Sequence, residues 1–86
     1  MAGNHVNSEI RRFILEKYPL ARRLQLKDSD ALLESGIVDS LGILDLVSFL
    51  EQQFSITVTD DELVPENFQT VERIVAFVET RTARTN

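Results

Sequence analysis

Two adjacent polar residues, Asp39 and Ser40, stand directly before a strongly patterned apolar segment, in the stretch GIVDSLGILDL at 36–46. Serine and aspartate are favoured at helix starts because their side-chain oxygens accept hydrogen bonds from the unpaired amides of the first turn. Ser40 can therefore be a helix cap. It can also be an exposed hydroxyl presented for chemical modification, and the rest of the sequence has to distinguish these two roles.

Other residue types that carry chemistry are scarce. The chain has no cysteine, and its single histidine is His5, so thiol catalysis is excluded and a Ser–His–Asp arrangement would depend on His5. The acids at 28–30 resemble the start of a calcium loop, but Leu33 and Asp39 occupy positions that require Gly and Glu. The three acids at 60–62 are consecutive, which is typical of a solvated first helical turn. The sequence therefore predicts no catalytic residue, no metal site and no enzymatic activity.

The length of 86 residues predicts one domain over residues 1–86, with flexible tails at about 1–6 and 82–86. A hydrophobic content of 43% is typical of a folded globule. The N-terminus lacks the apolar segment of a signal peptide, and no apolar run reaches the roughly 18 residues of a membrane span. A soluble, cytoplasmic, monomeric protein is the expectation.

The net charge of −5 is distributed unevenly. Residues 9–27 contain six basic and two acidic side chains, whereas residues 28–72 contain eleven acidic side chains and no Lys or Arg. An acidic segment of this kind repels nucleic acid and anionic lipid and attracts basic partner surfaces. The sequence therefore predicts neither a nucleic acid nor a membrane as partner. A solvated surface that only keeps the protein soluble explains the composition equally well.

Apolar residues at helical spacing predict three longer helices, at 7–18, at 40–54 and from residue 70 onward. The segment at 19–38 shows no strong periodicity, and we expect a long loop held across the core by its leucines. The stripe expected to be buried in the 40–54 helix contains Leu44, Val47, Leu50 and Phe54.

The segment between the last two long helices carries a second helix signal. Thr59 and Glu62 match a capping box that begins a short helix, and Pro65 is expected to end it. Residues 55–58 are predicted to form a packed extended link. The fold class is therefore all-α: a small four-helix bundle with three longer helices, one short third helix, and a long loop between the first two.

This arrangement resembles the acyl carrier protein family, which includes peptidyl and aminoacyl carrier domains. The resemblance runs from about Asn7 to Val78, and its motifs are Asp-Ser-Leu at the start of the second long helix and LxxLVxxLExxF at 41–54. It implies that Ser40, flanked by Asp39 and Leu41, carries covalent 4′-phosphopantetheine. A separate phosphopantetheinyl transferase would transfer this group from coenzyme A, and its terminal thiol would hold cargo as a thioester.

The resemblance also implies that the second long helix faces basic patches on partner enzymes, among them a ligase that loads the cargo and downstream transferases. The partner contacts it implies are Ile43, Asp45, Ser48 and Glu51, with Leu41 and Ile43 as exposed apolar contacts beside the prosthetic group. Ile43 can also be a partly buried core residue. Asp39 is better explained by docking of the transferase than by stability, since its charge does not help a neighbouring phosphate.

Several positions depart from the carriers of general fatty-acid synthesis. Gly42 and Ile43 follow the motif where those carriers place an acid first, Gln52 and Gln53 replace common acids, and the segment at 64–67 is about two residues longer. A carrier of a specialised pathway is at least as well supported. The alternatives are a discrete aminoacyl or peptidyl carrier loaded by an adenylating ligase, and an unmodified helical interaction module in which Ser40 is only a cap.

Overall fold

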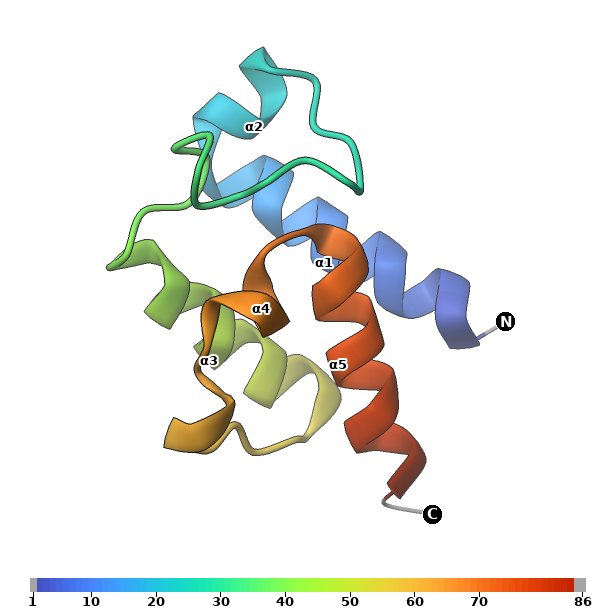
Figure 1. Ribbon diagram of the computed structural model, residues 1–86. Helices are drawn as coiled ribbons and strands as arrows, with labels where there is room; N and C mark the ends of the chain where they lie inside the picture. Colours follow the sequence, from blue (N-terminus) through green and yellow to red (C-terminus); the bar gives the residue numbers. More distant parts are fainter. Residues whose placement is uncertain (1, 85–86) are drawn as a thin grey trace.

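The computed structural model describes residues 2–84, and every regular element among them is helical (Figure 1). The all-α fold class is confirmed. The long helices are α1, α3 and α5, and the short elements α2, η1 and α4 lie between them. Their bounds are α1 (Ala2–Lys17), α2 (Pro19–Arg23), α3 (Gly42–Phe54), η1 (Asp60–Glu62), α4 (Pro65–Phe68) and α5 (Val71–Arg84).

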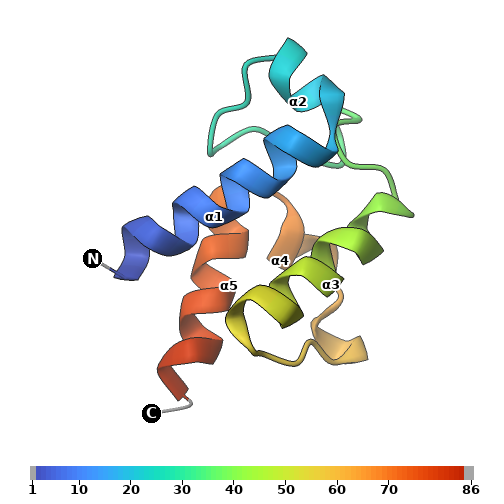
Figure 2. The ribbon, with the colours of Figure 1, turned by 180° about the vertical axis from the view of Figure 1, so that it is seen from behind.

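The three long helices bury one shared apolar core. α1 packs against α5, and α3 contacts α5 as well (Figure 2). Ile10, Leu50 and Ile74, one from each long helix, are fully buried. On the side of the core between α1 and α3, the rings of Phe13 and Phe49 stack with centroids 4.2 Å apart. None of the helices described at residues 2–84 is long and apolar enough to cross a membrane.

The first helix begins earlier than the sequence predicted. Residues 1–6 were expected to be a loose tail, but α1 begins at Ala2 and Val6 is buried. Val6 lies four residues before the buried Ile10, so it extends the same apolar stripe by one turn. At the other end, α5 continues to Arg84, although a flexible tail was expected from about residue 82. Residue 1 and residues 85–86 of the two predicted tails lie outside the described residues.

The long loop after α2 crosses one end of the helices and is held there by burial, as predicted (Figure 1). Leu26, Leu32 and Val38 are buried, and the Leu32 amide donates to the Gln69 carbonyl at 2.8 Å. An ion pair of 2.7 Å joins Asp28 to Arg11 on α1. The sequence did not predict α2, which Pro19 begins. Proline is favoured at a first helical position because its missing N–H needs no partner there.

The segment between α3 and α5 contains two short helices where the sequence predicted one. The capping box at Thr59 and Glu62 is confirmed, but it opens only the single turn of η1. Pro65 was expected to end a helix and instead occupies the start of α4. The reason is the same as at Pro19: the residue before each proline is extended, so a new helix can begin at the proline itself.

The buried face of α3 is rotated from the predicted one. Leu44 is 55% exposed, whereas Leu46, Val47 and Leu50 are buried. Ile43 and Phe54 pack partly against the core. The true stripe therefore starts at Ile43 and follows positions 43, 46, 47, 50 and 54, which fit helical spacing better than a stripe that starts at Leu44.

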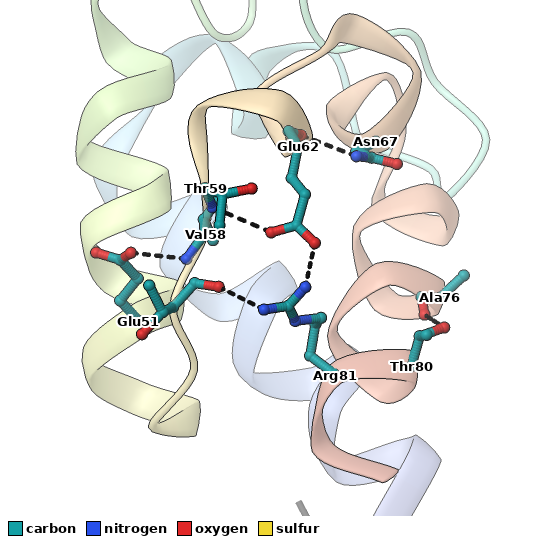
Figure 3. Close-up of polar contacts among 9 residues, drawn as sticks. Glu51, Val58, Thr59, Glu62, Asn67, Ala76, Thr80 and Arg81 are labelled. Atoms are coloured by element: carbon teal, nitrogen blue, oxygen red, sulfur yellow. Dashed lines mark hydrogen bonds and ion pairs between the residues drawn. The ribbon is translucent and has the colours of Figure 1, made fainter. Parts of the chain in front are cut away.

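Arg81 on α5 anchors the segment that follows α3 (Figure 3). One guanidinium nitrogen contacts the Glu62 carboxylate, and another donates to the Thr57 carbonyl at 3.0 Å. The Glu51 carboxylate on α3 accepts a hydrogen bond from the Val58 amide at 2.9 Å. Both ends of residues 57–62 are thereby tied to long helices.

The substitution Arg81→Met should lower the free energy of unfolding by about 1–2 kcal/mol, because it removes a partly buried ion pair and a hydrogen bond but keeps an apolar stem. Urea unfolding followed by circular dichroism measures the change. Arg73→Met is the matched control, since Arg73 is exposed on the same helix and should cost less than about 0.5 kcal/mol. Equal losses for the two variants would contradict the anchoring role of Arg81.

Candidate functional site

Ser40 lies in an exposed turn directly before α3. Its hydroxyl makes no hydrogen bond to another residue of the described chain, and the amides of Ser40 and Leu41 are likewise unused within it. The predicted helix began at Ser40, whereas α3 begins two residues later, at Gly42. The hydroxyl is therefore presented to solvent at the start of a long helix.

The cap of this helix is Asp39, and Ser40 takes no part in it. The Asp39 carboxylate accepts the Gly42 amide at 2.5 Å, and its backbone carbonyl accepts the Ile43 amide at 3.1 Å. The sequence favoured transferase docking over stability as the explanation of Asp39. The structure gives Asp39 a structural role, because it satisfies two amides that a helix start leaves without partners.

Tyr18, just beyond the end of α1, contacts the same helix start. Its hydroxyl donates to the Gly42 carbonyl at 2.6 Å. Burial raises the pKa of the Tyr18 phenol to about 12, with smaller contributions from the carboxylates of Asp45 and Asp39. Since the unperturbed pKa is about 10, the phenol stays protonated, and able to donate, throughout the neutral and mildly alkaline range. Sequence reasoning did not single out Tyr18 as a site residue, because its hydrogen-bond partner lies on another helix.

An apolar cavity of about 300 Å³ opens beside Ser40. One wall comes from the loop and α3, and the opposite wall from the segment between η1 and the end of α4. Apart from Ser40, the residues that line it are Leu33, Ile43, Leu44, Leu63, Val64, Pro65 and Phe68. This volume lies at the lower end of the range for small-molecule pockets, which are mostly apolar with a few polar groups at defined positions.

The predicted partner contacts at α3 differ in solvent exposure and in whether they already bind another residue of the chain. Leu41 is 77% exposed, as expected, and Ser48 is exposed. Asp45 is also exposed, although its carboxylate lies 3.7 Å from Lys17 Nζ. Of the two expectations for Ile43, an exposed contact or a partly buried core residue, the second is correct: Ile43 is half-buried and lines the cavity, because it begins the core stripe of α3. Glu51 is half-buried and its carboxylate holds the Val58 amide.

The site fits a phosphate ester and does not fit a metal. An exposed hydroxyl can become a phosphodiester without steric conflict, and the two unused amides beside it lie at the positive end of the helix dipole, which favours anions. Among the described residues, no group of three or more His, Cys, Asp or Glu side chains could hold a metal ion.

Comparison with known proteins agrees with this arrangement. The family model described as "Phosphopantetheine attachment site" matches residues 14–78. A Serratia protein named "Probable acyl carrier protein PigG" is 43% identical over 54 residues, which are 63% of this chain and 62% of that protein. An acyl carrier protein of Exiguobacterium sibiricum is 34% identical over 67 residues, 72% of this chain and 82% of that one. A D-alanyl carrier protein of Streptococcus suis is 37% identical over 54 residues, 63% and 67% of the two chains.

The different roles of Asp39 and Ser40 can be tested by substitution. Asp39→Ala should lower the free energy of unfolding by about 1 kcal/mol through loss of the cap. Asp39→Asn should keep most of the wild-type stability, since asparagine caps equally well. Ser40→Ala should change stability by less than about 0.5 kcal/mol. Chemical denaturation measures all three. If Ser40→Ala costs as much as Asp39→Ala, then Ser40 is itself the cap.

Proposed function

The chain belongs to the family of carrier proteins that bear covalent 4′-phosphopantetheine, and we propose that Ser40 is its attachment site. Members of this family carry cargo for other proteins, so the chain is not itself an enzyme. The observation that carries the proposal is the position of the Ser40 hydroxyl: exposed, without a partner in the described chain, and at the rim of an apolar cavity.

The chemistry required of Ser40 is modest. Its oxygen forms a bond to the phosphorus next to the pantetheine of coenzyme A, the pyrophosphate bond breaks, and adenosine 3′,5′-bisphosphate leaves. The hydroxyl proton passes to the transferase, which activates the serine together with Mg²⁺. When bound, phosphopantetheine supplies a thiol, which this cysteine-free chain lacks, and the thiol holds the cargo as a thioester.

The cavity supports an apolar acyl group as the cargo. Its lining is almost entirely aliphatic and aromatic, and no charged side chain borders it. The amino group of an aminoacyl cargo would find no carboxylate there, and burying an unpaired charge is costly. We therefore propose an acyl carrier, and the departures at Gly42, Gln52 and Gln53 support a specialised pathway over general fatty-acid synthesis.

A discrete aminoacyl carrier is the second candidate, and the similarity to D-alanyl carrier proteins favours it. A small aminoacyl group does not need a cavity, so it would remain outside in solvent. Under either candidate we propose that a transferase and a loading ligase approach Ser40 through basic patches that face the acidic α3. A monomeric state and a cytoplasmic location are part of the same proposal.

Incubation with coenzyme A, Mg²⁺ and a broad-specificity phosphopantetheinyl transferase should add one phosphopantetheine to the wild-type chain, because the Ser40 hydroxyl is exposed in the turn before a long helix. Intact mass spectrometry measures the gain. Ser40→Ala is the matched control and should show none while remaining folded. Absence of a gain on the folded wild type with several transferases would favour the interaction module.

The cargo class can be tested on the modified protein. A hexanoyl thioester should raise the free energy of unfolding by about 2 kcal/mol over the unloaded form, since each methylene buried in the cavity contributes about 0.8 kcal/mol. An alanyl thioester should leave stability unchanged. Val64→Phe, which fills the cavity, should abolish the hexanoyl effect. Equal stability of the hexanoyl and alanyl forms would contradict the acyl proposal.

A further inference from the structure

Tyr18 joins the end of α1 to the start of α3 through a single short hydrogen bond. The backbone of Tyr18 is extended, at φ −116° and ψ 103°, because it precedes Pro19. Its ring meets that of Phe13 edge to face, with centroids 6.2 Å apart, and its hydroxyl donates to the Gly42 carbonyl at 2.6 Å. The ring is therefore held by packing, and the hydroxyl contributes one directed contact to α3.

The contact leaves no room for a side chain at Gly42. A Cβ added at Gly42 would lie 2.8 Å from the Asp39 carboxylate and 3.1 Å from Cε1 of Tyr18. Both distances are closer than ordinary packing allows, so any larger residue would displace the cap or the phenol. Glycine lowers helix stability relative to alanine by up to about 1 kcal/mol, and the close approach of these two side chains explains why it stands here.

These contacts flank Ser40 without touching it. Asp39 precedes Ser40 and holds the Gly42 amide, while Tyr18 holds the Gly42 carbonyl two residues after it. Helix ends open locally with free energies near zero, so one hydrogen bond can decide how often the first turn is formed. A protein that binds only the formed turn has its apparent affinity reduced by the fraction of time the turn is open.

We propose that Tyr18 is a positioning residue for the modification of Ser40: its hydroxyl, through Gly42, keeps the first turn of α3 in the form that the transferase binds. The inference rests on the proposed function of Ser40. The neighbouring ion pair between Lys17 and Asp45 joins the same two helices, but it is 3.7 Å long between exposed side chains. Exposed pairs of this kind contribute little, so the phenol restrains the first turn more strongly than this ion pair does.

Tyr18→Phe removes only the hydroxyl and keeps the ring in place against Phe13. It should raise the KM of a phosphopantetheinyl transferase for the chain about fivefold and leave kcat unchanged, since one net hydrogen bond is lost from the binding-competent form. Amide hydrogen exchange should become faster by a similar factor at Ile43 and Leu44 and stay unchanged at Leu50 in the helix centre. Lys17→Met is the matched control, with KM within twofold of the wild type, a bound set by the weakness of exposed ion pairs.

Gly42→Ala gives a second, independent test. Helix propensity alone predicts that alanine stabilises the first turn and slows exchange at Ile43. Displacement of the phenol and the cap predicts the opposite: faster exchange and a raised KM. Slower exchange in Gly42→Ala would overturn the inference.

The remaining outcomes separate the inference from the function on which it rests. If neither wild type nor Tyr18→Phe gains phosphopantetheine, the proposed function fails, while amide exchange still tests whether Tyr18 holds the first turn. Unchanged KM and exchange in Tyr18→Phe would overturn the inference with modification intact. So would faster exchange at Leu50 to the same extent as at Ile43, because the hydroxyl would then stabilise the whole fold and not the first turn.

Discussion

Burial of the long loop between α2 and α3 is the constraint on which the site depends. A segment at 24–41 without regular structure would lose much conformational entropy on being fixed, and only apolar burial and hydrogen bonds can offset that loss. Leu32, Ile37 and Val38 supply the burial, and the Val38 amide closes the loop on the Leu32 carbonyl at 3.0 Å. Because Val38 is fixed in the core, the next two residues have to emerge at the surface beside α3.

The residues that hold this turn in place are different from the residue proposed for modification. Ser40 follows directly on the buried Val38 and the capping Asp39, yet its own side chain stabilises nothing in the described structure. A hydroxyl engaged in a cap would have to give up a hydrogen bond when it is esterified. Here Asp39 provides the cap, so esterification of Ser40 would leave the cap intact.

The features that depend on residues close together in the chain were predicted correctly from the sequence. Helical spacing located the three long helices, and the capping box at Thr59 placed η1. The same reasoning failed where tertiary contacts decide. Pro65 was taken as a helix end and α2 was not predicted at Pro19, although an extended residue before each proline lets a helix begin there. The predicted stripe on α3 was wrong at Leu44, since an exposed Leu44 and a half-buried Ile43 differ only in which side of α3 the neighbouring elements cover.

The same division between local signals and tertiary contacts applies to the candidate site. Ser40 as the proposed attachment site follows from its place before a long helix together with a family resemblance, both of which the sequence contains. Tyr18 does not, because the hydrogen bond to Gly42 joins residues 24 apart in the chain. The cavity does not either, since its walls come from the loop, α3 and the 63–68 segment, whose approach depends on the whole fold.

The acids of α3 serve two different purposes, and this narrows the surface a partner can use. Glu51 matches the family pattern, but its carboxylate holds the Val58 amide, and the segment that continues from there through η1 supplies the far wall of the cavity. A partner that drew Glu51 away would loosen this wall. Asp45 and Ser48 are exposed on the first half of α3, and Leu41 and Leu44 lie nearby. The accessible charge and apolar surface therefore gather near Ser40, the proposed attachment site, and include Leu44, which itself lines the cavity.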